Sequence, residues 1–381
     1  MISINDMEHL KHRAAEFTQT TSEGVVVSRL GLSITLFFKE GYTVEKREGI
    51  LACFQRFREE FGEQLRYQTH DFKGMAKYTP ENIVKVEAKI RQQGLYGRSE
   101  WYVSDAKGAN DAPNFILRFL NSVEAGGKEA LSYICLVLPW DYIYDEAGMA
   151  RFESWLMFLC EQVEPYSGDA GYCLVLPRDY YDYFPLEYQL AQRYPSMLVI
   201  STSHTAKNQY FHAIRGANWY TLLSQKLVRR LGGREWIKHA FSKNHEIEVV
   251  NFRDGLIIRA GRHPDLTPKS EGLSPAYQMV NQLVRPIRVK YHEGHSLHFY
   301  GANHFTEETT YEWYARYDNA PLIRTPLQSG FPALVGGEWK TASQPNSTLR
   351  LNQGDIAPTS RDGQVIMWEL VLEIPEEEPY F

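Results

Sequence analysis

The densest group of potential metal ligands lies between residues 292 and 304. Its members are His292, Glu293, His295, His298 and His304. Imidazoles this close could share a zinc ion, which takes three or four ligands in a tetrahedral array. The spacing matches no recognised zinc motif, and in an extended segment His295 and His298 point to opposite faces. We therefore favour ordinary surface or packing histidines, and we predict neither a metal site nor a cofactor.

The sequence also lacks the motifs that mark other kinds of catalytic or phosphate-binding site. The sequence has no GxGxxG after a strand, no P-loop, no HExxH, no CxxC and no GxSxG. Asp141, Asp145 and Glu146 follow a strand end, where an α/β enzyme could place acids, but they equally suit a helix N-terminus, which we favour. Each cysteine lies among apolar neighbours, where desolvation disfavours the thiolate: Cys53, Cys135, Cys160 and Cys173. We predict no catalytic residue.

The composition of the chain limits the kinds of molecule that it is expected to bind. The 381 residues include 41 basic and 47 acidic side chains, a net charge of −6. Binding to phosphate backbones needs a basic face, so we expect no nucleic-acid partner. No apolar run approaches the roughly 18 residues of a membrane span, and the first residues contain no apolar signal region. We therefore expect a soluble, reduced, cytoplasmic chain with no membrane partner.

One segment has the composition of a docking surface. Asp179, Tyr180, Tyr181, Asp182 and Tyr183 alternate acids with tyrosines and are followed by a phenylalanine. Exposed aromatic side chains flanked by carboxylates make a good surface for a basic protein partner. The same tyrosines could instead form a wall of the protein's own core, with their hydroxyl groups bonded at its rim. The sequence leaves both interpretations open.

The elements that position these residues alternate between strands and helices. Apolar periodicity, caps and breakers predict helices at 43–62, 80–90, 146–163, 186–193, 218–231 and 275–285, and strands at 30–38, 100–104, 115–121, 133–138, 171–176, 246–252 and 256–260. The strand at 30–38 alternates apolar residues with small ones, as a half-buried strand does. Asp254-Gly255 between two apolar runs predicts a hairpin. We expect an α/β (α+β) fold with a mixed, largely antiparallel sheet covered by helices, in which helix-linked strands allow parallel pairs.

The chain divides into three parts by its composition and by the pattern of predicted elements. Residues 1–22 read as a helical and polar extension, and residues 23–320 as the main α/β domain. After residue 320, frequent proline and glycine break the chain into short segments, of which only 347–351 and 365–373 resemble strands. We interpret 321–381 as a small β-rich C-terminal module with a solvated acidic tail at 376–378.

Four blocks in the main domain resemble a known family. They are residues 214–223, which contain Gly216-x-Asn218-Trp219-x-Thr221-Leu222-Leu223, then Leu231-Gly232-Gly233, then residues 255–264, and finally 275–277 together with 284–288. In order and spacing they resemble the type VI secretion immunity protein family (TsiV-like), formerly a domain of unknown function, over roughly 25–290. The likeness implies structural roles for Gly216 (turn), Asn218 (helix cap), Trp219 (core anchor) and Gly232 with Gly233 (helix stop). After Pro264 the family's Gly-Asp turn is replaced by Asp265-Leu266-Thr267-Pro268, so that loop departs from the pattern.

The resemblance implies a cytoplasmic antidote that binds a cognate secreted toxin, plausibly a nuclease, and occludes its active site. Two alternatives remain. One is an enzyme, either a hydrolase using Asp141 and the histidines of 292–304 or an activity that reverses the toxin's modification. The other is an adaptor of the secretion machinery that docks through the C-terminal module. The toxin-facing residues must be argued from this sequence, and Asp179–Tyr183 is the segment we predict.

Overall fold

The computed structural model describes residues 4–71, 73–93, 97–122, 130–203, 207–253, 255–291, 294–299, 301–318, 327–333, 336–341, 344–352 and 354–374. Within these ranges, eleven strands form one large sheet and four form a small second sheet. Every pairing between the strands of these ranges is antiparallel. The predicted α+β class, with a largely antiparallel sheet and a β-rich C-terminal part, is confirmed. The parallel strand pairs that the spacing allowed do not occur there.

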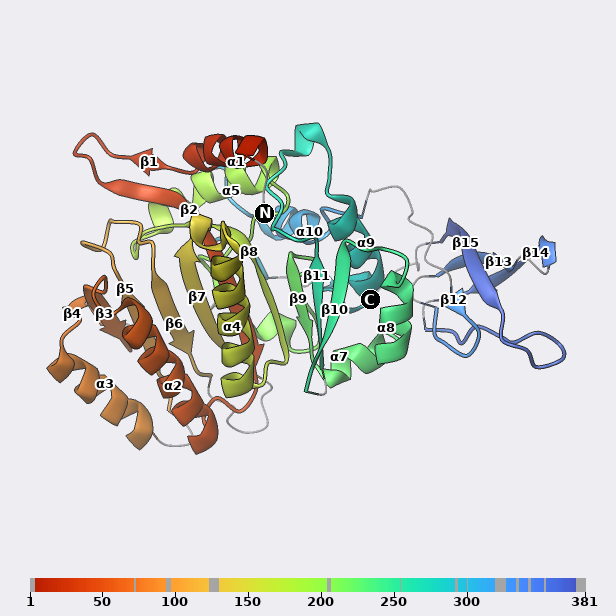
Figure 1. Cartoon of the computed structure of the whole chain (residues 1–381), viewed down its shortest axis with the longest axis horizontal. Coiled ribbons are helices and arrows are strands. Elements are labelled where there is room, and N and C mark those ends of the chain that lie inside the picture. Colours follow the sequence, from red (N-terminus) through yellow and green to blue (C-terminus); the bar gives the residue numbers. More distant parts are fainter. Residues whose placement is uncertain are drawn as a thin grey trace.

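The large sheet places the longest strands at its centre (Figure 1). In spatial order its strands are β10 (Ile247–Phe252), β11 (Gly255–Ala260), β9 (Tyr220–Leu223), β8 (Ser167–Val175), β2 (Val26–Phe38), β7 (Ser132–Pro139), β6 (Ile116–Leu120), β5 (Glu100–Ser104), β3 (Tyr67–His70) and β4 (Ala76–Lys77), and β1 (Gln19–Thr20) pairs with β2. All the strands predicted from periodicity are present, as is the hairpin at β10 and β11. Asp254 of its turn lies outside the described residues.

Three helices cover one face of this sheet. They are α2 (Val44–Phe61), α3 (Pro80–Gln92) and α4 (Glu146–Val163), which lie side by side in Figure 1. Each begins at a side-chain cap: Thr43, Thr79 and Asp145 accept the backbone N–H of the residue three positions on. This bond satisfies one of the unpaired N–H groups of a first helical turn. The capping interpretation of Asp145 is confirmed.

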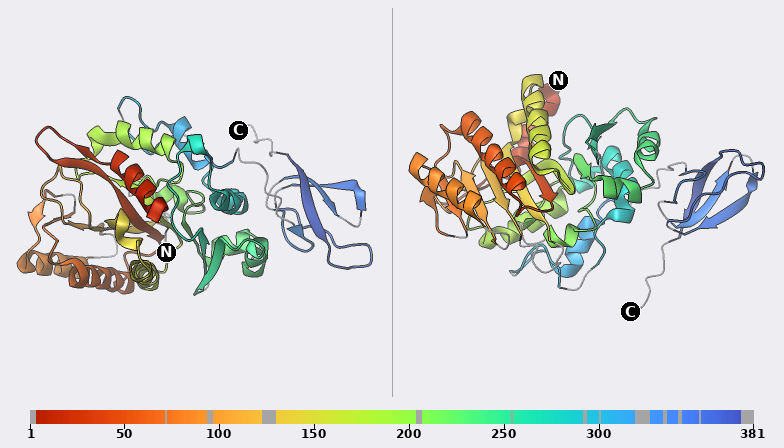
Figure 2. Two further views of the ribbon diagram at one scale, coloured as in Figure 1. Left: turned by 45° about the horizontal axis from the view of Figure 1, so that its top comes forward. Right: turned by 90° about the horizontal axis from the view of Figure 1, so that it is seen from below.

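Further helices surround the rest of the sheet: α1 (Ile4–Glu16), α5 (Phe184–Arg193), α7 (Gln225–Arg230), α8 (Arg234–Phe241), α9 (Pro275–Val284) and α10 (Glu307–Tyr314). Viewed along the sheet, α10 lies on the side opposite α2–α4 (Figure 2). The sequence patterns did not predict α8 and α10. Within the described ranges, no helix combines the length and the apolar character needed to cross a bilayer.

The alternation of apolar and small residues in β2 predicted a half-buried strand, and this prediction is wrong. Leu32 and Ile34 are buried as expected, but Ser33 and Thr35 between them are also fully buried. Both faces of the central strands are therefore covered, in the way more usual for parallel sheets. The face of small and polar residues carries the irregular chain between α5 and β9, because side chains that small leave room for it.

The predicted helix at 218–231 is wrong in its first half. Tyr220–Leu223 is strand β9, which pairs with β8 on one side and β11 on the other, and only Gln225–Arg230 is helical. Four consecutive buried residues fit a central strand as well as a buried helix face, so periodicity alone cannot separate them. Pairing on both edges decides in favour of the strand. Gly232 and Gly233 follow α7 with positive φ angles, which fits the predicted helix stop.

The C-terminal residues form the small sheet, ordered β12 (Leu327–Gln328), β15 (Met367–Glu373), β13 (Gly337–Thr341) and β14 (Gln344–Leu351). It lies beyond α8 in Figure 1, and Phe331 stacks on Trp236 of that helix with ring centroids 5.3 Å apart. The strands predicted at 347–351 and 365–373 are present, whereas β12 and β13 were not predicted. The boundaries near residues 22 and 320 stay predictions, and the acidic tail lies outside the described residues.

Trp219 gives a direct test of this core. Its side chain is fully buried, stacks on Phe152 and donates its indole N–H to the carbonyl of Gly261 at 3.2 Å. We expect Trp219→Ala to lower the free energy of unfolding by about 3–5 kcal/mol, the usual cost of such a truncation. Val84→Ala, at an exposed position on α3, is the control and should change it by less than about 0.5 kcal/mol. Urea unfolding of both variants measures the difference, and equal stabilities would contradict the assignment.

Candidate functional site

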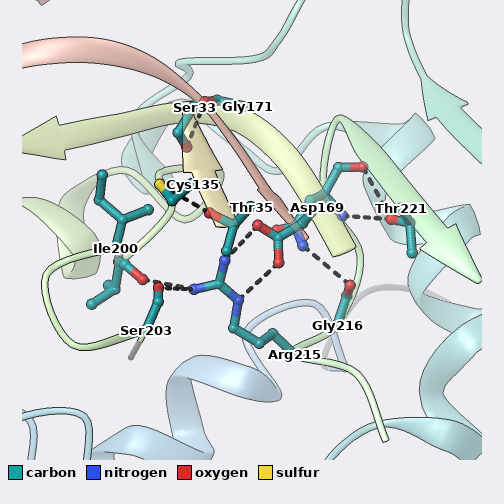
Figure 3. Close-up of polar contacts among 12 residues, drawn as sticks. Ser33, Thr35, Cys135, Asp169, Gly171, Ile200, Ser203, Arg215, Gly216 and Thr221 are labelled. Carbon is teal, nitrogen blue, oxygen red and sulfur yellow. Dashed lines mark hydrogen bonds and ion pairs between the residues drawn. The ribbon is translucent and has the colours of Figure 1, made fainter. Parts of the chain in front are cut away.

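The family-like segment between residues 214 and 223 is organised by a buried ion pair (Figure 3). Arg215 directs its guanidinium at Asp169 of β8, with Nε 2.8 Å from Oδ2 and a second bond to Oδ1. Both side chains are at least 95% buried. Arg215 also donates to the carbonyl of Val199 at 2.7 Å and to the hydroxyl of Ser203. This arrangement joins the sheet to two stretches of irregular chain, and so it is structural.

The neighbouring motif residues also hold the chain in place. Gly216 has φ of +127°, a conformation in which other side chains are strained. Asn218 begins no helix, which corrects the predicted cap. Instead its side chain donates to the carbonyl of Gly216 and accepts from Arg316, which also binds the carbonyl of Ala217. The polar groups of the motif are therefore bonded to one another inside the protein.

The histidines of 292–304 do not form a metal site among the residues that the structure describes. His295 is buried and bonds the hydroxyl of Tyr314 at 3.1 Å, and His304 is half-buried. His292 and Glu293 lie outside the described residues. Across the described ranges, no three His, Cys, Asp or Glu side chains gather as a metal ion would require.

His298 belongs to a buried cluster that resembles a catalytic triad only in composition. Its Nε2 lies 2.9 Å from the Glu187 carboxylate, to which the hydroxyl of Ser201 also donates. Its Nδ1 accepts the backbone N–H of Phe305, so the proton of the neutral ring is on Nε2. A nucleophilic serine must give its proton to the histidine. Here Ser201 and His298 both donate to Glu187, so the histidine is not placed to accept the serine's proton.

The cysteines are also placed as core residues. All four are free and buried. Burial raises the pKa of the Cys53, Cys160 and Cys173 thiols above their ordinary value, which keeps them protonated and unreactive.

The predicted docking segment is partly exposed. Asp179, Tyr181 and Asp182 are at the surface, with Tyr181 44% exposed, whereas Tyr180 is only 5% exposed and Tyr183 is half-buried. Tyr180 therefore belongs to the core side of the segment and Tyr181 to its outer side. Their rings lie 4.7 Å apart, so the exposed ring rests on a buried one. The core interpretation therefore fits Tyr180, whereas the docking interpretation stays a prediction, with Tyr181 as its exposed aromatic residue.

The His298 cluster holds this segment in position. Phe184, directly after it, stacks on the imidazole of His298 with ring centroids 4.0 Å apart. Glu187, in the first turn of α5, provides the carboxylate of the same cluster. At the other end, the backbone N–H of Asp179 donates to the carbonyl of Ala109. The segment is thus fixed at both ends while Tyr181 faces outward.

A large open groove of about 1110 Å³ lies elsewhere, beside β10 and β11. Among its charged side chains, Arg259 bonds both Glu153, at 2.7 Å, and Glu248. His263 lines the same groove, and burial together with the nearby Arg262 lowers its pKa, which keeps the ring neutral. The groove therefore offers shape and, at Arg259, paired charges.

The sequence interpretation missed the half-buried charge at 118 and the buried charges at 169, 187 and 215. One signal was present in the pattern: Arg118 and Asp169 are each the only charged residue of an otherwise buried strand. Buried charges are rare unless paired, so a lone charge in an apolar run indicates a partner elsewhere in the chain. That partner could not be identified before the strand order was known.

Comparison with known proteins identifies the fold and the family pattern. The family model of TsiV, described as type VI immunity for VRR-NUC, matches residues 49–317. Among solved structures, the Pseudomonas aeruginosa T6SS protein PA0821 superposes with a TM-score of 0.70 at 19% sequence identity, over 83% of this chain and 91% of that chain. At that identity the likeness shows a shared fold. No curated protein matches the sequence.

The buried ion pair gives a second prediction. Asp169→Ala leaves the Arg215 charge unpaired inside the protein, and we expect a loss of about 3–5 kcal/mol in the free energy of unfolding. Replacing both partners, as Asp169→Leu/Arg215→Met, should cost less than the sum of the two single changes, because no lone charge remains. The exposed pair Lys11 and Glu8 provides the control, since Glu8→Ala should cost less than about 1 kcal/mol. Additive losses in chemical denaturation would contradict this account.

Proposed function

The chain belongs to the family of type VI immunity proteins for VRR-NUC, and we propose that it binds a VRR-NUC toxin and inhibits it by covering the toxin's active site. The observation that carries the proposal is the segment Asp179–Tyr183, where an exposed tyrosine stands between two exposed aspartates on a fixed framework. Packed aromatic side chains supply most of the binding energy of many protein interfaces, and the charges around them steer the encounter.

The charge of the chain supports this choice of partner. We infer that the toxin is a nuclease, which needs a basic surface to bind its substrate's phosphates. A chain with a net charge of −6 and with Asp179 and Asp182 beside its exposed tyrosine complements such a surface. A nuclease of this kind acts where DNA lies, so we place the encounter in the cytoplasm. The four free cysteines are compatible with that reducing compartment.

We further propose that inhibition requires binding alone, without catalysis by this chain. In support, the Ser201–Glu187–His298 cluster is buried, and its histidine is not placed to accept the proton of the serine. An adaptor that docks through the C-terminal sheet is the alternative, and nothing in that sheet favours it over the Asp179–Tyr183 surface.

The role of Tyr181 can be measured directly. We expect Tyr181→Ala to weaken binding to the VRR-NUC toxin by about thirtyfold, corresponding to roughly 2 kcal/mol at an interface hot spot. Tyr291→Ala is the matched control, because Tyr291 is 61% exposed on a different segment and should leave the affinity within twofold. Tyr180 is a poor test residue, since its burial makes stability and binding change together.

Isothermal titration calorimetry gives both affinities, and thermal unfolding shows whether each variant is folded. A stable Tyr181→Ala variant that binds as tightly as the unchanged chain would remove the segment from the interface. Asp179→Asn/Asp182→Asn should chiefly slow association and reduce its dependence on salt, because these carboxylates act by steering.

The mechanism of inhibition gives a separate prediction. If the chain inhibits by occlusion, nuclease activity should fall in proportion to added chain and vanish at a fixed molar ratio. An enzyme that reverses a modification would protect at a small fraction of that ratio and increasingly with time. Titrating a fixed amount of toxin in a nuclease assay separates the two, and time-dependent protection far below equivalence would refute occlusion.

A further inference from the structure

A small polar cavity lies directly beside Tyr181. Its volume is about 160 Å³, and its wall includes Glu100 and Tyr102 from β5, Arg118 from β6, Tyr133 from β7, and Arg178 and Tyr181 from the segment that follows β8. Neither the motifs of the sequence nor the immunity fold assigns it a role. It opens next to the exposed tyrosine of the Asp179–Tyr183 surface.

The strand register explains why these side chains meet. Tyr102 lies opposite Arg118, and Arg118 lies opposite Cys135, so their side chains emerge on the same face of the sheet. Glu100 lies two residues before Tyr102 and therefore faces the same way. Arg118 is held in place by a bond from its Nη2 to the carbonyl of Ile200 at 2.5 Å. The floor of the cavity is thus rigid sheet rather than loop.

The cavity wall carries more positive than negative charge. Arg118 and Arg178 contribute two guanidinium groups, against the single carboxylate of Glu100, which lies 3.8 Å from Arg178. Burial raises the pKa of the Tyr102, Tyr133 and Tyr180 hydroxyls above the ordinary value, so all three remain protonated and able to donate. A group that complements this wall must be an anion that accepts several hydrogen bonds.

The size of the cavity limits that anion. Pockets that enclose a whole small-molecule ligand usually measure roughly 300–1,000 Å³. This one holds a single functional group on a short stem and is too small for a nucleotide. A carboxylate fits in both size and chemistry, because it accepts two parallel bonds from a guanidinium.

We propose that this cavity receives one carboxylate side chain, an aspartate or glutamate, of the bound toxin. The proposal rests on the proposed function, since it places the cavity inside the toxin interface next to Tyr181. The inserted carboxylate accepts from Arg178 at the mouth and from the phenol and guanidinium groups behind it. It provides the one contact of opposite sign within a surface whose exposed residues, Asp179 and Asp182, are acidic.

A double-mutant cycle tests the insertion. Arg178 is 27% exposed, so Arg178→Gln should fold normally, and we expect it to weaken toxin binding about tenfold or more. Arg193→Gln, which removes an exposed arginine from nearby α5, is the matched control and should leave the affinity within twofold. Each surface Asp and Glu of the toxin is then changed to Asn or Gln. One of these changes should weaken binding to the unchanged chain yet add little to the effect of Arg178→Gln.

A second arm distinguishes a side chain of the toxin from a free carboxylate. Sodium propionate, compared with sodium chloride at equal ionic strength, should compete with the toxin for the unchanged chain but not for Arg178→Gln. If propionate stabilises the free chain and leaves toxin binding unaffected, the cavity takes a free carboxylate and the insertion is refuted.

The remaining outcomes separate this proposal from the one on which it rests. If the complex forms, Tyr181→Ala weakens it, and no toxin carboxylate couples to Arg178, then insertion is wrong and the proposed interface stands. If the unchanged chain forms no complex with the toxin, the proposed function itself is wrong.

Discussion

The ion pair between Arg215 and Asp169 is the constraint on which the centre of this structure depends. Asp169 lies on β8, which pairs with β2 on one side and β9 on the other. A buried carboxylate there is tolerable only if a cation meets it in good geometry, because an unpaired charge costs several kcal/mol. Arg215 can reach it only when the chain leading into β9 follows one path. The pair therefore contributes less to net stability than to the choice of a single arrangement.

Side chains farther along the sheet, toward the surface, also fix irregular chain in place. Asp169, Thr35, Cys135, Arg118 and Tyr102 lie opposite one another on consecutive strands, forming one row on one face. The row holds successive carbonyls of a single irregular segment at two of its members: Asp169 binds Arg215, which donates to the carbonyl of residue 199, and Arg118 donates to the carbonyl of residue 200. Small side chains in the middle of the row leave room for that segment. The polar face of the sheet thus serves as a rigid base for the loops that we place against the toxin.

Local signals in the sequence predicted most elements of the fold. Thr43 caps a helix as expected, the helix predicted from residue 80 is present, and β10 pairs with β11 as the predicted hairpin, because such features depend on a few neighbouring residues. Strand β9 was mistaken for a helix, since its identity comes from pairing with β8 and β11 rather than from its own pattern. For the same reason the partner of Asp169, 46 residues away, was not identifiable. The small cavity needs three neighbouring strands and a loop, so only tertiary structure reveals it.

The exposed charges of the Asp179–Tyr183 surface and the recessed charges of the cavity beside it differ in sign, and together they determine which partner proteins this surface can select. Exposed aspartates alone would attract any basic protein, and net charge distinguishes such proteins poorly. Under the proposed insertion, the recessed arginines add a second requirement, because a partner without an acid at that position would remove water from Arg178 and Arg118 without supplying a new acceptor. Such a surface discriminates between partners in two ways: contacts stabilise the complex with the right partner, and desolvated groups raise the free energy of a complex with a wrong one. Arg118 stands on the sheet, whereas Arg178 and the exposed acids belong to the segment that follows β8, so the acids can change while Arg118 stays in place. A scaffold built in this way allows recognition of new toxins while the Arg215–Asp169 pair and the fold around it stay the same.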